Sequence, residues 1–260
     1  MNEVIVVDSA DNARPRRRWW LWGSLILLLV IVIVASGFAL WALNPLVQID
    51  PVALSATENG DNVTVTDRAW LAFIPHEPPS TGVIFYPGGR VPAEAFAPLA
   101  RSLAESGYLT VIVYPPLNLA ILNRDLATPV MAHFSAIDHW VVGGHSLGGT
   151  VASWYAAAHP ERVSGLFMLG TYVTGDHLAE SDLPITLVYG TRDGLATVEE
   201  IESARSNLPP QTTYVAIEGG NHAQFGYYGE QAGDQSATIE REAQIAQSVE
   251  AILALLQQVD

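Results

Sequence analysis

Three side chains that can act together as nucleophile, acid and base follow three separate apolar runs of the chain. Ser146 lies in GGHSLGG, Asp193 in YGTRDG and His222 in GGNHAQFG. A serine hydroxyl is a weak nucleophile at neutral pH, so it needs an imidazole to take its proton and a carboxylate to orient that imidazole. The chain has no cysteine, which excludes thiolate nucleophiles and thiolate metal ligands. These residues predict catalysis by an oxygen nucleophile that requires no cofactor and no metal.

The residues around the serine are those of a sharp turn between a strand and a helix. The run Gly144-His145-Ser146-Leu147-Gly148 stands between an apolar strand pattern and a helical pattern. Small neighbours permit the crowded backbone of such a turn, which projects the hydroxyl above the sheet. The N-terminus of the helix that follows favours an oxyanion at the same place. The pattern therefore predicts an exposed nucleophile, although a plain turn between a strand and a helix can carry the same pattern.

The proposed acid and base follow later strands of the same predicted sheet. Asp193 comes directly after the apolar run PITLVYG, and His222 comes after TTYVAIEGG. In an open parallel sheet, loops that follow the strands meet at one edge. The order Ser146, Asp193, His222 is also the order associated with this type of serine turn. We therefore expect the three side chains to converge.

Two alternatives for the acid remain open. Asp176 and Asp182 lie on the preceding connection, and either could serve as a displaced acid. Asp193 could instead cap the helix that begins near Leu195, which is a common role of aspartate. We expect capping only if the Asp193 side chain is turned away from His222.

A second oxyanion donor is expected from the loop YPGGR, residues 86–90. Paired glycines let backbone N–H groups approach a ligand closely. The N–H of Gly89 or Arg90, together with that of Leu147, is the predicted oxyanion hole. The Arg90 side chain could recognise a carboxylate or phosphate of a substrate, or it could be a solvated surface residue.

The elements that position these residues alternate between short apolar strands and longer helical segments. Residues 63–75 alternate in polarity and predict one or two edge strands. Strands of this apolar kind, separated by helices, indicate a mostly parallel sheet covered on both faces. Strands are predicted at 82–87, 109–115, 140–144, 163–170, 184–190 and 212–220, and helices at 92–107, 118–134 with a possible break at Pro129, 147–159, 196–207 and 238–258.

Taken together, GHSLGG, YGTRDG, GGNHAQFG and YPGG resemble the motifs of the α/β-hydrolase superfamily over residues 63–260. The resemblance implies an α/β-hydrolase fold with Ser146 as nucleophile, Asp193 as acid and His222 as base. The chain is also similar to small bacterial hydrolases near the dienelactone-hydrolase-like branch. The best-known members of that branch use cysteine where this chain has serine, so lactone hydrolysis is not implied.

Members of this family often carry a helical cap after the sixth strand. Here only residues 171–183 are available, and this segment is too short for a large cap. The longer loop at 223–238 contains Phe225, Tyr227 and Tyr228, and it is a better candidate for a pocket wall. The alternative is an ordinary packed loop.

The N-terminal region predicts a membrane anchor. Residues 19–43 contain no charged side chain, and at about 1.5 Å per helical residue they can cross a bilayer core of roughly 30 Å. Arginines precede this segment, so the positive-inside rule predicts a cytoplasmic tail at 1–18. A cleaved signal peptide, with a processing site near residues 35–37, is the alternative. Residues 44–62 are predicted to be a linker to the α/β-hydrolase domain at 63–260.

The charge of the chain argues against nucleic acid as a partner. Residues 44–260 hold eight arginines, no lysine and 24 acidic residues, for a net charge of −16. Phosphate backbones require clustered cationic side chains. We therefore expect a single-pass membrane protein with an extracytoplasmic serine hydrolase domain that takes a small carboxylic ester or thioester. An acyltransferase with the same three residues, and a non-catalytic lipid- or peptide-binding protein, are the alternatives.

Overall fold

The protein is described here from a computed structural model in which residues 19–43 and 49–260 are placed. The apolar helix α1 (Trp19–Leu43) is a unit separate from the folded body that contains the remaining elements. It confirms the helix predicted at 19–43 and is long and apolar enough to span a membrane. The predicted tail at 1–18 and residues 44–48 of the predicted linker lie outside the described residues.

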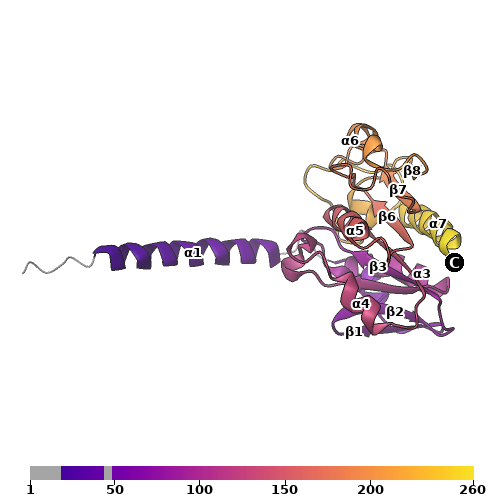
Figure 1. Ribbon diagram of the computed structural model, residues 1–260, viewed down its shortest axis with the longest axis horizontal. Coiled ribbons are helices and arrows are strands. Elements are labelled where there is room, and N and C mark those ends of the chain that lie inside the picture. The colour runs from indigo at the N-terminus through magenta and orange to yellow at the C-terminus, as the bar shows by residue number, and fades with distance from the viewer. Residues whose placement is uncertain (1–18, 44–48) are drawn as a thin grey trace, which may run out of the picture. The chain divides into compact units, whose positions relative to one another are not determined.

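The folded body is built on a single mixed sheet with the order β1-β2-β4-β3-β5-β6-β7-β8 (Figure 1). β1 pairs antiparallel with β2, and β2 with β4, whereas the other neighbours are parallel. This confirms the predicted mostly parallel sheet with edge strands at 63–75. The strands are β1 (Val63–Asp67), β2 (Trp70–Pro75), β3 (Thr81–Tyr86), β4 (Leu109–Val113), β5 (His139–His145), β6 (Gly165–Leu169), β7 (Ile185–Gly190) and β8 (Thr213–Ile217).

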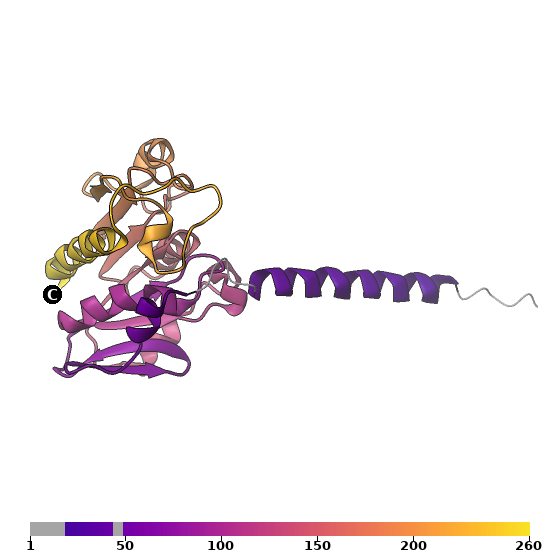
Figure 2. The ribbon, with the colours of Figure 1, turned by 180° about the vertical axis from the view of Figure 1, so that it is seen from behind.

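Helices cover both faces of the sheet, as predicted (Figures 1 and 2). One face is covered by α3 (Ala97–Glu105) and α7 (Arg241–Val259). The other face is covered by α4 (Ala127–His133), α5 (Leu147–Ala158) and α6 (Val198–Ser203). Single-turn helices lie in the connections, at η1 (Ala93–Phe96), η2 (Pro116–Asn118), η3 (Ala120–Leu122), η4 (Arg205–Asn207) and η5 (Ala223–Phe225).

The central strands are mostly apolar because both of their faces are buried. In β5, Val141 faces the α3 and α7 layer, and Val142 faces the α4 and α5 layer. In β3, Phe85 and Ile84 divide in the same way. Successive side chains of a strand point to opposite faces, so a continuous apolar run fills two cores.

Two segments differ from the sequence-based expectation. Part of the predicted linker forms the short helix α2 (Pro51–Ser55), whose first turn is capped by the side chain of Asp50 and which buries Ala53 against the domain. The helix predicted at 118–134 is broken before Ala127 and not at Pro129. Pro129 lies in the first turn of α4, where the missing N–H of proline costs no intrahelical hydrogen bond.

Candidate active site

Ser146 lies at the sharp turn between β5 and α5. Its backbone has φ 52° and ψ −125°, a region that non-glycine residues rarely adopt and that costs energy to maintain. A Cβ atom on Gly144 or Gly148 would lie 2.3 or 2.0 Å from the Tyr86 carbonyl oxygen. Close backbone packing between this turn and the end of β3 therefore requires glycine at both positions. The Ser146 hydroxyl does not cap α5.

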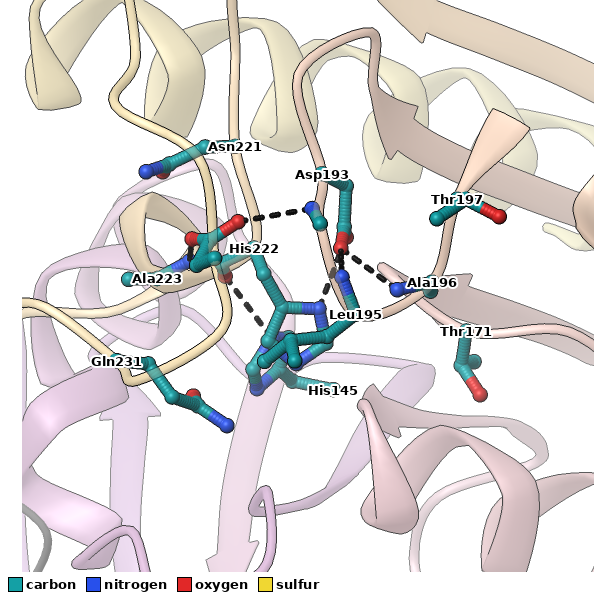
Figure 3. Close-up of polar contacts among 12 residues, drawn as sticks. His145, Thr171, Asp193, Leu195, Ala196, Thr197, Asn221, His222, Ala223 and Gln231 are labelled. Carbon is teal, nitrogen blue, oxygen red and sulfur yellow. Dashed lines mark hydrogen bonds and ion pairs between the residues drawn. The ribbon is translucent and has the colours of Figure 1, made fainter. Parts of the chain in front are cut away.

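Asp193 and His222, the predicted acid and base, form a buried pair beside this turn (Figure 3). Nδ1 of His222 lies 2.8 Å from Oδ2 of Asp193, and both side chains are excluded from solvent. Because a carboxylate accepts, Nδ1 carries the proton and the lone pair of the neutral ring is on Nε2. Nε2 is buried without a hydrogen-bond partner among the described residues. This is the tautomer that a general base needs.

Asp193 performs two roles at once. Its Oδ1 atom accepts hydrogen bonds from the N–H groups of Leu195 and Ala196, at 2.8 and 2.7 Å, while Oδ2 contacts His222 (Figure 3). The alternative that Asp193 caps a helix near Leu195 is therefore wrong, because α6 begins at Val198 and Thr197 is its N-cap. The two carboxylate oxygens have separate partners, and the loop N–H groups that bind Oδ1 hold Oδ2 toward His222.

Ser146 and His222 line one cleft of about 410 Å³. No hydrogen bond joins Ser146 Oγ to His222 Nε2 in the part of the chain that the structure describes. Catalytic hydrogen bonds are often long in the absence of substrate and become shorter when it binds. The other cleft residues come from the start of α5, the loop after β6, the loop after β7 and the loop after β8, namely Leu147, Thr150, Gly170, Thr171, Tyr172, Thr174, Leu195, Ala196 and Gln231.

The predicted oxyanion donors differ in their backbone pairing. The N–H of Arg90 donates to the Asn118 carbonyl at 2.8 Å, so it is already engaged. Of the two alternatives in this loop, Gly89 is the better donor, because its N–H and that of Leu147 have no backbone partner among the described residues. A Cβ atom on Gly89 would lie 3.2 Å from the Leu147 side chain, so the two residues are neighbours.

His145, the residue before the serine, lies beneath the base. Its ring centroid is 4.5 Å from that of His222, and its Nε2 lies 3.2 Å from the His222 carbonyl oxygen (Figure 3). Since a carbonyl only accepts, Nε2 is the protonated nitrogen of His145. Burial, followed by the charge of His222, holds the pKa of His145 well below its usual value. His145 is therefore a neutral support for His222.

The aromatic residues of the loop at 223–238 do not line the cleft. Phe225, Tyr227 and Tyr228 are buried in the core, and the Phe225 and Tyr228 rings pack against His145. The expectation that these rings form the pocket wall was wrong. Gln231 is the cleft residue from this loop.

Sequence reasoning missed the loop after β6 as a source of cleft residues. Thr171 and Tyr172 line the cleft, and the Thr171 hydroxyl lies 3.0 Å from that of Thr150. The available signal was the position of these residues directly after a central strand. Within the described residues, no group of three or more histidine, aspartate or glutamate side chains could hold a metal ion.

The fold and this site define an α/β protein with a strained serine at the carboxyl edge of a mostly parallel sheet. The chain belongs to the alpha/beta hydrolase family, whose sequence model matches residues 82–246. This membership supports a hydrolase.

Solved structures show the same fold at low identity. A bacterial membrane phospholipase A is 15% identical with a TM-score of 0.59, over 93% of this chain and 99% of its own. TT1662 from Thermus thermophilus is 16% identical with a TM-score of 0.55, over 75% and 98%. Est1E from Butyrivibrio proteoclasticus is 14% identical with a TM-score of 0.54, over 76% and 100%. No curated protein sequence matches the chain significantly.

Proposed function

We propose that this protein is a serine hydrolase that cleaves carboxylic esters or thioesters with Ser146, His222 and Asp193. The observation that carries the proposal is a strained serine in the same cleft as a buried His222–Asp193 pair. The unpartnered Nε2 of that pair is the atom that would take the serine proton. A protein that only binds ligands would not need a basic nitrogen in this position.

In the proposed reaction, Ser146 Oγ attacks the carbonyl carbon of the substrate while its proton moves to His222 Nε2. The oxyanion forms near the N–H groups of Leu147 and Gly89. The bond to the alcohol or thiol then breaks, and His222 returns the proton to this leaving group. Water then attacks the acyl-enzyme while its proton moves to His222. His222 returns this proton to Ser146 Oγ as the acid product leaves.

The cleft suits a small acyl or alcohol group of mixed polarity. Leu147, Leu195 and Ala196 supply apolar contacts, whereas Thr150 and Thr171 supply hydroxyls. Two structures with this fold are esterases by name, one from Thermogutta terrifontis and one a domain of a Rhodothermus marinus protein, and this supports an ester as the substrate.

We also propose that α1 anchors the enzyme in the cytoplasmic membrane, with the tail at 1–18 inside and the catalytic domain outside. The length and hydropathy of α1 and the arginines before it support this topology.

One fractionation experiment tests both proposals. Membranes that contain the full chain are washed with carbonate, returned to neutral buffer, and assayed for hydrolysis of p-nitrophenyl acetate, with and without an added alcohol acceptor. We expect the chain in the membrane pellet, and activity lowered more than about a thousandfold in Ser146→Ala.

The outcomes separate the two claims. Recovery of the chain in the carbonate supernatant would contradict the anchor but leave the chemistry intact. Equal activity in Ser146→Ala would contradict the nucleophile. An acyl-alcohol product that dominates over free acid would assign the protein as an acyltransferase.

A further inference from the structure

One carboxylate outside the three proposed catalytic residues connects the two loops that carry the acid and the base. Oδ1 of Asp234 accepts the N–H of Gly194 at 3.0 Å, and Oδ2 accepts the N–H of Ala223 at 2.8 Å. Gly194 directly follows Asp193, and Ala223 directly follows His222. Asp234 therefore holds the backbone next to each member of the His222–Asp193 pair.

Neighbours of Asp234 reinforce the same connection. We call residues 233–236 the strap. Arg192 Nε donates to the Ser236 carbonyl at 2.6 Å, and Asn221 Nδ2 donates to the Gln235 carbonyl at 2.7 Å. The strap is thus hydrogen-bonded both to the loop after β7 and to the start of its own loop after β8.

The strap lies close against the acid loop. A Cβ atom on Gly194 would lie 2.5 Å from the Gly233 carbonyl oxygen and 3.0 Å from Asp234 Cα. Glycine at position 194 is therefore what allows Asp234 to reach the acid loop. The atoms in close contact belong to the backbone of Gly233 and Asp234, so the contact does not depend on a flexible side chain.

We propose that Asp234 is a positioning residue that keeps Asp193 and His222 in register. Hydrogen bonds from N–H groups to a carboxylate are among the stronger ones in proteins. Asp193 and His222 stand on separate loops, so a small displacement of either loop would lengthen the contact between Nδ1 and Oδ2. Displacements of about 1 Å in a catalytic site can cost roughly a hundredfold in rate. This proposal rests on the proposed function of the pair.

The variant Asp234→Asn in the full chain, purified in detergent micelles, tests the proposal. Asparagine keeps the size but replaces one acceptor oxygen with an amide that faces an N–H donor. The matched control is Glu230→Gln, which removes the same charge from an exposed residue of the same loop. Two properties are measured, namely ester turnover and the downfield proton resonance of His222 Nδ1–H in ¹⁵N-labelled protein.

We expect kcat to fall at least about tenfold in Asp234→Asn, with KM within about twofold of the wild type. We also expect the Nδ1–H resonance to be lost or broadened, and Glu230→Gln to match the wild type in both properties. Wild-type kcat and resonance in Asp234→Asn would overturn the proposal. An equal loss in Glu230→Gln would also overturn it, because charge alone would then be the cause.

Two further measurements keep the test independent. If Asp234→Asn does not fold, amide hydrogen exchange in the wild type tests the proposal instead. The proposal requires strong protection of the Gly194 and Ala223 amides. Fast exchange at either amide would contradict it. If the wild type hydrolyses no ester, the proposed function fails, and the Nδ1–H resonance still reports whether Asp234 holds the pair.

Discussion

The serine side and the acid–base side of the site are held in place by different forces. Ser146 is fixed by backbone packing, because Gly144 and Gly148 bring the turn into contact with the Tyr86 carbonyl. The backbone beside Asp193 and His222 is instead held by a side chain, because the Asp234 carboxylate accepts the N–H groups of Gly194 and Ala223. One side therefore depends on the absence of side chains, and the other depends on their presence.

This difference predicts how each side should respond to mutation. The serine turn has no space for a larger residue, so changes there should cost folding free energy. The acid and base loops have polar connections that can be removed one at a time, so changes there should cost rate first. His145 belongs to both sides, since it precedes Ser146 and contacts the His222 carbonyl.

The largest effect is expected from Gly148→Ala. The new methyl group would lie 2.0 Å from the Tyr86 carbonyl and 2.4 Å from that of Pro87, and backbone atoms cannot move aside easily. We expect a loss of more than about 4 kcal/mol in the free energy of unfolding, which is close to the whole stability of a marginally stable domain. Circular dichroism and thermal unfolding of the purified chain measure the loss.

Gly165→Ala is the matched control, because Gly165 of β6 is also a buried glycine. Its new methyl group would meet side chains at 3.3 Å or more, and these can shift. We expect a loss of about 1–2 kcal/mol. Equal losses in the two variants would show that the serine turn is no more tightly packed than the rest of the sheet.

A smaller effect is expected from the pH dependence that His145 confers. Burial holds its folded pKa well below the usual value, whereas the unfolded chain binds a proton below about pH 6.5. The contribution of His145 to the free energy of unfolding is therefore complete above that pH. It is lost as the pH falls, by up to about 1.4 kcal/mol per pH unit. His145→Gln should remove this pH dependence. The difference in free energy of unfolding between the wild type and His145→Gln should therefore shrink or reverse as the pH falls from about 7.5 to 5.

Denaturant titrations across this pH range measure the difference. The pKa of His177 is also lowered, mainly by burial, but His177 is present in both proteins and its contribution cancels. If the difference in free energy of unfolding between the wild type and His145→Gln did not change with pH, this would contradict a neutral, buried His145.

The sequence predicted the parts of the site that local patterns control. Ser146 is marked by the glycines around it, and Asp193 and His222 are marked by their positions after apolar strands. The parallel sheet brings these positions to one edge, as the strand order shows. These features depend on residues close in sequence and on the general rule for parallel strands.

The parts that were missed depend on contacts between distant residues. Asp234 looks like an ordinary acid in the polar part of a loop, and nothing local shows that it reaches Gly194. Phe225 and Tyr228 were expected to line a pocket, but they pack in the core against His145. Sequence alone could not separate these environments, because an aromatic side chain suits a cleft and a core equally well.

The most direct test of the account is covalent labelling of the full chain by a fluorophosphonate probe, followed by intact mass measurement. Labelling requires the two sides to meet, so that His222 activates Ser146. We expect a single adduct on the wild type and none on folded Ser146→Ala or folded His222→Ala. No adduct on the folded wild type, or an adduct that persists in Ser146→Ala, would contradict the account.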